Sequence, residues 1–285
     1  MADDTSPAIG PIENHRRREK GILVYPVYSR RSGGLSVGIN LFPAKKVCPF
    51  DCPYCEVFPF TTDAAFNPSQ MEDDLRASIV AAEKQKVPVR DICFSGNGEP
   101  SLSPDLPEAL ERAGRVRGSL VPAAKLVLIT NGAGLLEKEV FSFLAEAVYS
   151  LDLDIWLKLD AGTPAWYEKI NRSSIPFDKL LEKIRKFTSC VPVTIQTMLC
   201  AIESAPPPHE EERAWEALVV ELAGNGKGLR KVQVYGKARP APEDPKAQAL
   251  PLEYLRRRSE SLESLFTQSK NTEPRAGSPP VEVFP

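Results

Sequence analysis

The stretch Lys45–Phe60, KKVCPFDCPYCEVFPF, places Cys48, Cys52 and Cys55 within eight residues. Three thiols at this spacing are too many for a redox-active pair and one too few for a closed zinc site. A zinc ribbon would need a second Cys-x-x-Cys pair, which the sequence lacks. Three clustered thiolates suit an iron–sulfur cluster, whose irons are held by cysteine sulfur. On a four-iron cube they would leave one iron open for chemistry.

The other cysteines and both histidines lie away from this stretch. Cys93, Cys190 and Cys200 have no chelating spacing, and we expect them to be buried as small hydrophobic side chains. His15 and His209 lie in polar stretches, and we expect them on the solvated surface. Six cysteines in 285 residues are too few for a disulfide scaffold, so a reducing, cytoplasmic setting is predicted.

Short apolar runs alternate along the chain with segments of helical spacing. We expect strands at GLSVGINLF, VRDICFSG, AKLVLITNG, LDIWLKLDA, VPVTIQTMLC and RKVQVYGKA, with amphipathic helices between them. This alternation predicts βα units and a parallel sheet, as in an α/β partial (β/α)6 barrel. A doubly wound sheet fits the same pattern. In either fold, ligands bind at the carboxyl ends of the strands.

Length and composition fit a globular protein of one barrel-sized domain or two smaller ones. The chain is 42% hydrophobic and 26% charged, with a net charge of −2. We predict a flexible N-terminal tail at 1–20, a core domain at 21–250, and a C-terminal helix and extension at 251–285. In the extension we expect loose order over 270–279 and a short strand in PPVEVFP. No run of eighteen apolar residues suggests a membrane span, and the polar N-terminus does not read as a secretory signal.

The spacing Cys-x-x-x-Cys-x-x-Cys, with Tyr54 directly before Cys55, resembles the radical S-adenosylmethionine (radical SAM) superfamily. The resemblance implies an enzyme of the partial-barrel fold in which Cys48, Cys52 and Cys55 hold a 4Fe-4S cluster. Its open iron would chelate S-adenosylmethionine. One electron, from a donor such as flavodoxin or ferredoxin, would then cleave this cofactor to methionine and a 5′-deoxyadenosyl radical that abstracts hydrogen from a substrate.

A narrower resemblance covers roughly Val24 to Arg239. The segment VYSRRSGGLSVGINLFPAKKVCPFDCPYCE, followed by FSGNGEPSL, resembles the radical SAM group related to the wyosine-forming tRNA-modifying enzymes. Those enzymes carry extra cysteines for a second cluster, or a flavin domain, and this sequence shows neither.

The resemblance also implies residues that bind the cofactor. In SGNGEP, Gly96, Asn97 and Gly98 allow close approach of the backbone to a ligand, and Glu99 would bind the methionine ammonium. The alternative for this motif is a plain strand-to-helix turn. Tyr54 of the cysteine motif belongs to the same predicted set.

Four further residues are predicted near the strand ends. Lys158 and Asp160 are two residues apart and therefore share a face of their strand. Lys158 would pair with the methionine carboxylate, and Asp160 would bond the ribose hydroxyls. The alternative is an ion pair between the two side chains. Asn131 and Gln196 follow apolar runs and are weaker cofactor or substrate candidates. For the turn that holds Asn131, a structural role is favoured.

The substrate and the catalytic residues stay open. A small molecule or a protein is favoured over tRNA, because the only basic concentration is Arg16–Arg18 with Lys20, Arg30 and Arg31. Alternatives are a tRNA-base-modifying enzyme, an enzyme that activates a partner by forming a glycyl radical, and a zinc-binding interaction protein without enzymatic activity.

Overall fold

The computed structural model describes residues 21–269 and 278–285. Contacts divide the chain into two compact units. Unit 1 comprises the residues up to Cys48, together with Pro59–Ile129 and Glu146–Asp154. Unit 2 comprises Pro49–Phe58, Thr130–Ala145 and the residues from Ile155 onward. The predicted tail at 1–20 and most of the predicted loose segment at 270–279 lie outside the described residues.

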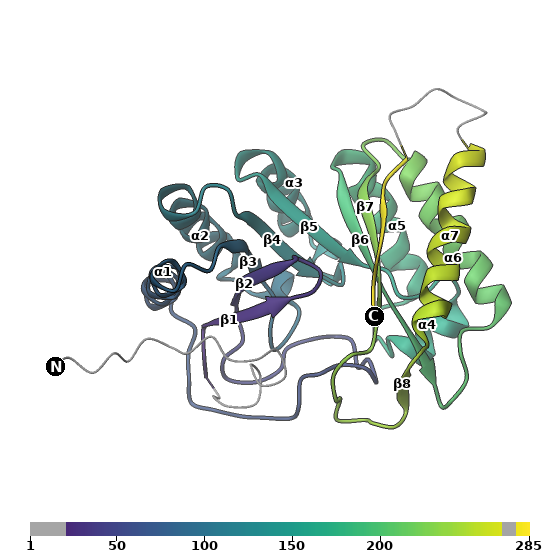
Figure 1. Cartoon of the computed structure of the whole chain (residues 1–285), viewed down its shortest axis with the longest axis horizontal. Helices are drawn as coiled ribbons and strands as arrows, with labels where there is room; N and C mark the ends of the chain where they lie inside the picture. The colour runs from purple at the N-terminus through teal and green to yellow at the C-terminus, as the bar shows by residue number, and fades with distance from the viewer. Residues whose placement is uncertain (1–20, 270–277) are drawn as a thin grey trace. The chain divides into compact units, whose positions relative to one another are not determined.

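Unit 1 contains the first four strands and the helices that follow them (Figure 1). Its elements, in chain order, are β1 (Val24–Ser29), β2 (Gly34–Ile39), α1 (Pro68–Lys84), β3 (Val89–Phe94), the 3-10 helix η1 (Pro100–Leu102), α2 (Leu106–Leu120) and β4 (Lys125–Thr130). The strands lie in the order β1-β2-β3-β4. β2, β3 and β4 are parallel, as predicted, whereas β1 is antiparallel to β2 and was not predicted.

Local sequence explains where the helices of unit 1 begin. Asn67 is the N-cap of α1, and its side chain accepts hydrogen bonds from the amides of Ser69 and Gln70. Pro68 occupies the first helical turn, where its missing N–H costs nothing. The core of the unit is apolar and includes the fully buried Leu75 and Phe94.

Unit 2 contains the second half of the chain. Its elements are the 3-10 helix η2 (Ala133–Leu136), α3 (Lys138–Ser150), β5 (Leu153–Lys158), α4 (Pro164–Ile170), α5 (Phe177–Cys190), β6 (Val193–Ile202), α6 (His209–Gly224), β7 (Leu229–Gly236), β8 (Ala247–Ala249), α7 (Leu252–Ser269) and β9 (Val281–Phe284). α3 and β5 begin or end in unit 1. The strands lie in the order β5-β6-β7-β9 and are parallel, while β8 is antiparallel to β6.

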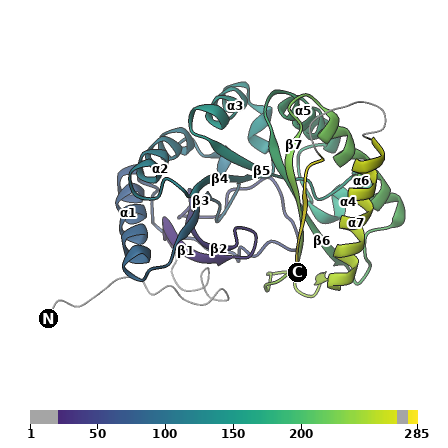
Figure 2. The same cartoon turned by 45° about the horizontal axis from the view of Figure 1, so that its top comes forward.

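The helices of unit 2 pack through apolar faces. In α5, Leu180, Ile184 and Phe187 recur at helical spacing and are buried. α6 and α7 lie side by side in both views (Figures 1 and 2). The helix at the C-terminal end and the short strand in PPVEVFP were both expected from the sequence and are present as α7 and β9.

None of the helices in the described part of the chain combines the length and apolar character needed to cross a membrane.

Candidate functional site

The three clustered cysteines lie in the long connection between β2 and α1. None of the three forms a disulfide in the described structure, and all three are partly exposed. The amide of Cys55 donates to the carbonyl oxygen of Cys52 at 2.9 Å, which closes a tight turn around the Cys-x-x-Cys segment. Cys48 belongs to unit 1, and the other two belong to unit 2.

In unit 1, the residue before the first cysteine pairs with the SGNGEP loop. Val47 forms a parallel bridge with Gly98, and the amide of Glu99 donates to the carbonyl oxygen of Val47 at 2.8 Å. A Cβ atom on Gly98 would lie 2.3 Å from that same carbonyl oxygen. Only glycine therefore allows this approach. The structure thus brings the predicted glycine loop directly to the start of the cysteine motif.

The side chain of Glu99 is buried and caps η1. One carboxylate oxygen, Oε1, accepts from the amide and the hydroxyl of Ser101 at 3.0 and 2.5 Å. The motif therefore is a strand-to-helix turn, the alternative that the sequence left open. Its role in cofactor binding stays a prediction.

Asn40 holds the other end of this loop. It was not among the site residues predicted from the sequence. Its Oδ1 accepts from the amide of Asn97 at 3.1 Å and from that of Phe42 at 3.2 Å. Gly96 has a φ of +143°, and a Cβ atom there would lie 2.8 Å from the same Oδ1. Asn40 and Gly96 together fix the loop through contacts that only a small residue permits.

In unit 2, the loop that follows α4 clamps the cysteine segment. The carbonyl oxygen of Asn171 accepts from the amide of Asp51 at 3.0 Å. The amide of Ser174 donates to the carbonyl oxygen of Pro49 at 3.2 Å. The Cys52 thiol accepts from Nδ2 of Asn171 at 3.6 Å and donates to its carbonyl oxygen at 3.8 Å.

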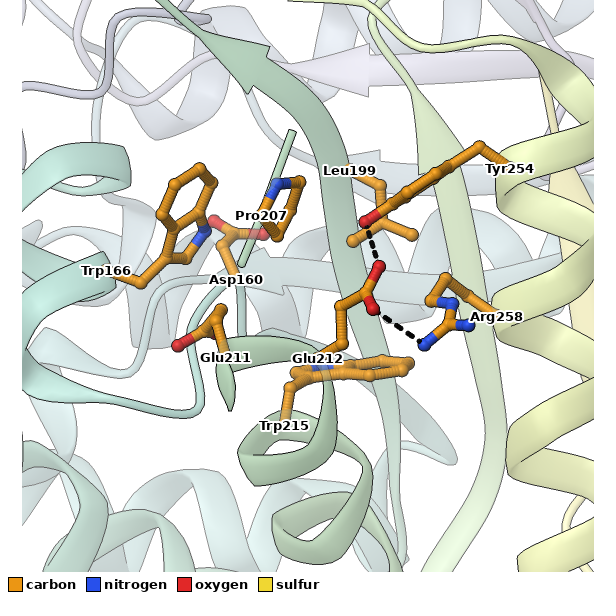
Figure 3. Close-up of a pocket in the computed structure, with 9 residues that line it drawn as sticks. All are labelled: Asp160, Trp166, Leu199, Pro207, Glu211, Glu212, Trp215, Tyr254 and Arg258. Atoms are coloured by element: carbon orange, nitrogen blue, oxygen red, sulfur yellow. Dashed lines mark hydrogen bonds and ion pairs between the residues drawn. The ribbon is translucent and has the colours of Figure 1, made fainter. Parts of the chain in front are cut away.

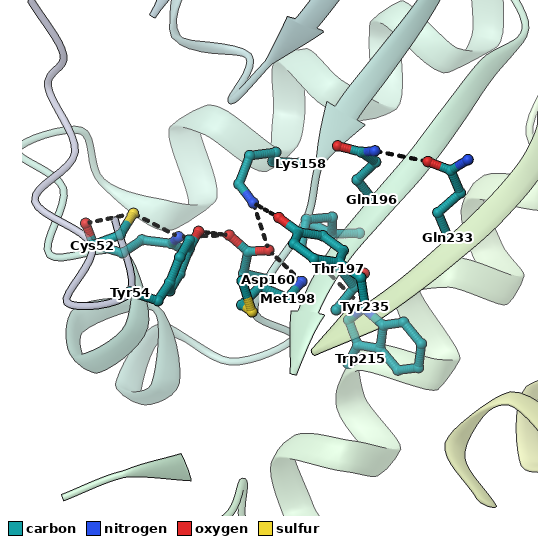
Figure 4. Close-up of polar contacts among 12 residues, drawn as sticks. Cys52, Tyr54, Lys158, Asp160, Gln196, Thr197, Met198, Trp215, Gln233 and Tyr235 are labelled. Carbon is teal, nitrogen blue, oxygen red and sulfur yellow. Dashed lines mark hydrogen bonds and ion pairs between the residues drawn. The ribbon is translucent and has the colours of Figure 1, made fainter. Parts of the chain in front are cut away.

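Asp160 is the centre of the polar contacts in unit 2 (Figure 4). Its Oδ2 accepts from the hydroxyl of Tyr54 and from Nδ2 of Asn171, the latter at 3.0 Å. Its Oδ1 accepts from the amide of Met198 at 2.9 Å and from Nζ of Lys158 at 3.3 Å. The side chain is 0% exposed. Four donors therefore surround one fully buried carboxylate.

Lys158 lies between two tyrosine rings. Its Nζ is 5.0 Å from the ring centre of Tyr54 and 5.1 Å from that of Tyr235, and it donates to the Tyr235 hydroxyl at 2.5 Å. Burial by itself would lower the pKa of this amine. The Asp160 carboxylate and Tyr235 outweigh burial and raise the pKa above its ordinary 10.5. Lys158 is thus held as a cation, and the ion pair proposed from the sequence is present.

The thiol and the phenol near Asp160 shift in the opposite sense, toward their neutral forms. Burial raises the pKa of Cys52 to about 11, and the charge of Asp160 adds to this effect. The pKa of Tyr54 is raised for the same two reasons. A metal ligand must be a thiolate, so binding at Cys52 would release its proton.

The remaining predicted residues have structural partners. Gln196 is fully buried on β6, and its Nε2 donates to Oε1 of Gln233 at 2.7 Å. Asn131 is buried and accepts from the amide of Ala133 at 2.9 Å, which closes the turn at the end of β4. A structural role for that turn was favoured from the sequence, and the contact fits it.

Three side chains of unit 2 that lie in or near the site were not predicted from the sequence. Tyr235 shares the face of β7 with Gln233, at the carboxyl end of the strand, so alternation would have found it. Asn171 ends a short helix, and nothing in its sequence neighbourhood marks it. Trp156 lies on the same face of β5 as Lys158, two residues before it. Its buried indole Nε1 has no hydrogen-bond partner in the described structure.

The cysteines outside the cluster and the described histidine meet most expectations. Cys93 and Cys200 are buried, as predicted, and burial raises the pKa of Cys200 to about 12. Cys190 is exposed, which contradicts the prediction, because it is the last residue of α5 and lies off the buried stripe. His209 is 92% exposed in its side chain and contacts Glu212. His15 lies outside the described residues.

A pocket of about 260 Å³ lies on unit 2 beside Asp160 (Figure 3). Its polar side chains are already paired. Glu212 accepts from the hydroxyl of Tyr254 at 2.5 Å and forms an ion pair with Arg258 at 3.1 Å. Glu211 accepts from the amide of Thr163 at 2.9 Å. These contacts join α6 to α7 and to the loop after β5, so they account for the pocket's charged residues structurally.

The chain resembles several known proteins in sequence or in fold. Over 174 residues the chain is 28% identical to the UPF0026 protein of Helicobacter pylori, which covers 59% of this chain and 52% of that protein. The chain therefore spans about half the length of that curated relative. A radical SAM methyltransferase from Sphaerobacter thermophilus matches 92% of this chain and 69% of its own, at a TM-score of 0.64 and 14% identity.

Archaeal TYW1 matches 87% of this chain and 84% of its own, at a TM-score of 0.52 and 11% identity. These likenesses confirm the predicted fold class, the α/β partial barrel of the radical SAM type. Residues 45–205, more than half of the chain, match the Radical SAM superfamily. The chain belongs to the radical SAM superfamily.

Proposed function

We propose that Cys48, Cys52 and Cys55 hold one 4Fe-4S cluster and that the protein binds S-adenosylmethionine there. The observation that carries this proposal is the spacing of the three cysteines, none of them in a disulfide, in a segment that the SGNGEP loop contacts at Val47 and Asn171 contacts at Asp51. When bound, the cluster would supply one electron that cleaves the cofactor to a 5′-deoxyadenosyl radical. This radical would abstract hydrogen from the substrate.

The chemistry of the donor set fits a cluster better than a single ion. A structural zinc site typically has four protein ligands, and this motif supplies three cysteines without a second pair elsewhere in the sequence. In a 4Fe-4S cluster each thiolate binds its own iron, so three thiolates leave one iron open. The zinc-binding alternative is therefore the weaker one.

The residues of the chain would bind and orient the cofactor. The proposed cofactor-binding set is Tyr54, Gly96, Asn97, Gly98, Glu99, Asn131, Lys158, Asp160 and Gln196. Within this set Lys158 offers a buried positive charge suited to a carboxylate. Asp160 already accepts from four donors, so we propose that it holds Lys158 and Tyr54 in place and does not itself contact the ribose.

Trp156 adds an unpaired donor on the same face of β5 as Lys158. Buried polar groups in native proteins are almost always paired, so a buried indole N–H without a partner needs an explanation. We propose that an acceptor on the cofactor or the substrate completes it. Trp156→Phe removes this donor together with part of the ring system and should weaken binding without loss of iron.

The substrate is proposed by class only. A net charge of −2 favours a small molecule or a protein over tRNA as the substrate. We propose a protein of the flavodoxin or ferredoxin class as the electron donor. The likeness to archaeal TYW1 concerns the fold, and it carries no tRNA substrate over to this chain. We propose no second function.

Reconstitution without oxygen tests the proposal. Wild-type protein should hold about four irons per chain, as one such cluster requires. Cys48→Ala, Cys52→Ala or Cys55→Ala should each abolish the iron–sulfur absorbance, whereas the triple variant of Cys93, Cys190 and Cys200 should keep it. With dithionite, the wild type should convert S-adenosylmethionine to 5′-deoxyadenosine, measured by chromatography. One zinc per chain with no iron would overturn the proposal.

A further inference from the structure

Asn171 uses both hydrogens of its side-chain amide on two different partners. It is the C-cap of α4 and is only 2% exposed. Its Nδ2 donates to Sγ of Cys52 at 3.6 Å and to Oδ2 of Asp160 at 3.0 Å. One buried amide thus joins a cysteine of the cluster motif to the carboxylate that organises Lys158 and Tyr54.

Only one of the two contacts between Asn171 and the Cys52 sulfur can survive metal binding. The bond from the thiol to the Asn171 carbonyl oxygen needs the S–H proton, which a metal-bound thiolate has lost. The bond from Nδ2 to the sulfur remains and becomes stronger, because its acceptor is then charged. Hydrogen bonds to the sulfurs of a cluster help to set its reduction potential. A donor stabilises the more negative, reduced state and raises that potential.

Asn171 also stands between two negative groups. The Asp160 carboxylate and a Cys52 thiolate would repel each other, and the amide offers a donor to each. We propose that Asn171 is a positioning residue that orients Cys52 and raises the reduction potential of the cluster by its N–H···S bond, while it shields the sulfur from Asp160. This inference rests on the proposed function, because it assumes that Cys52 binds the cluster.

The test is a potentiometric titration of reconstituted protein, followed by electron paramagnetic resonance. Asn171→Asp keeps the shape of the side chain but replaces the donor with an oxygen that carries charge. Asn171→Ala removes the donor without adding charge. We expect both variants to have a more negative midpoint potential than the wild type, with the larger shift for Asn171→Asp.

Asn225→Ala is the matched control. This asparagine also lies in unit 2, and its Nδ2 donates to the carbonyl oxygen of Arg185 at 2.7 Å and to the Thr188 hydroxyl. It has no contact with a cysteine of the motif among the described residues. Its loss should lower stability and leave the midpoint potential unchanged.

Each outcome decides the inference. A midpoint potential equal to that of the wild type in both Asn171 variants, with iron retained, would overturn it. So would failure of the Asn171→Ala variant to fold, which would mark the residue as structural only. Loss of iron from a variant whose circular dichroism and melting temperature match the wild type would support the orienting role. If the wild type itself holds no cluster, the proposed function fails, and this result is distinct from the others.

Discussion

Replacing Asp160 with asparagine tests whether one carboxylate organises the polar centre of unit 2. The amide has almost the same shape, but it offers one accepting oxygen instead of two. Each carboxylate oxygen of Asp160 receives two donors: Tyr54 and Asn171 on one, the Met198 amide and Lys158 on the other. In either orientation, the new NH₂ group faces two donors.

The magnitude follows from burial. The side chain of Asp160 is 0% exposed and that of Lys158 is 17% exposed, so the pair is largely shielded from water. Removing one partner of a buried pair leaves an uncompensated charge and costs about 3–5 kcal/mol. That is a large share of the roughly 5–15 kcal/mol by which a typical native protein is stable. We therefore expect Asp160→Asn to lower the free energy of unfolding by about 3–5 kcal/mol.

Urea unfolding at neutral pH, followed by circular dichroism, measures this loss. Asp152→Asn is the control, because the Asp152 side chain is 81% exposed and contacts Arg117 at 3.8 Å. Exposed pairs of this kind contribute less than about 1 kcal/mol. The double variant Lys158→Met with Asp160→Asn should recover part of the loss, since no buried cation remains. A loss in Asp160→Asn no larger than in the control would refute the reasoning.

Three further changes address other parts of the site. Gly98→Ala would place a Cβ atom 2.3 Å from the Val47 carbonyl oxygen and should lower the free energy of unfolding in urea by about 1–3 kcal/mol. Gly118→Ala, in open space on α2, is the control and should raise it by about 0.5–1 kcal/mol. Equal effects of the two changes would contradict the close approach at Gly98. Burial raises the pKa of Asp91 above 3.8, so its stabilising contribution is full below pH 3.8 and is lost as the pH rises through the folded-state pKa. The free energy of unfolding of Asp91→Asn should therefore rise relative to that of the wild type as the pH rises. A difference between the two proteins that stays constant with pH would contradict the raised pKa. Glu99→Ala should weaken binding of S-adenosylmethionine roughly ten- to a hundredfold, about 1.5–3 kcal/mol, as measured by equilibrium dialysis of protein that retains its iron. Unchanged binding would mean that the SGNGEP motif is only a turn.

The regular alternation of strands and helices was predictable because its cause is local. Each predicted strand run overlaps a strand of the structure. β1 was missed because Pro26 interrupts its apolar pattern. Proline is tolerated in that strand since β1 is an edge strand and pairs only with β2 among the described strands.

The polar site was predictable only in part, because its contacts are not local. Spacing alone placed Lys158 and Asp160 on one face and identified the three cysteines. The contact between Cys52 and Asn171 joins residues 119 positions apart, and that between Lys158 and Tyr235 joins residues 77 apart. No periodicity within either segment encodes such a pairing.

The role that we propose for Asp160 differs from the one predicted from the sequence for a related reason. Sequence spacing showed a carboxylate at a strand end, where ligands gather, and suggested a direct contact with the cofactor. The number of donors around that carboxylate depends on three other segments, which supply Tyr54, Asn171 and the Met198 amide. Only the folded chain shows that its accepting positions are taken.

The cost of this arrangement indicates its purpose. A buried ion pair contributes little net stability, and apolar residues of similar volume often do as well or better. Stability alone therefore does not explain why Asp160 and Lys158 are buried together. What the carboxylate does achieve is position: it fixes the Tyr54 hydroxyl, the Lys158 amine and the Asn171 amide relative to one another. Because Tyr54 lies between Cys52 and Cys55 in the chain, fixing its hydroxyl also restrains the segment that carries these two thiols.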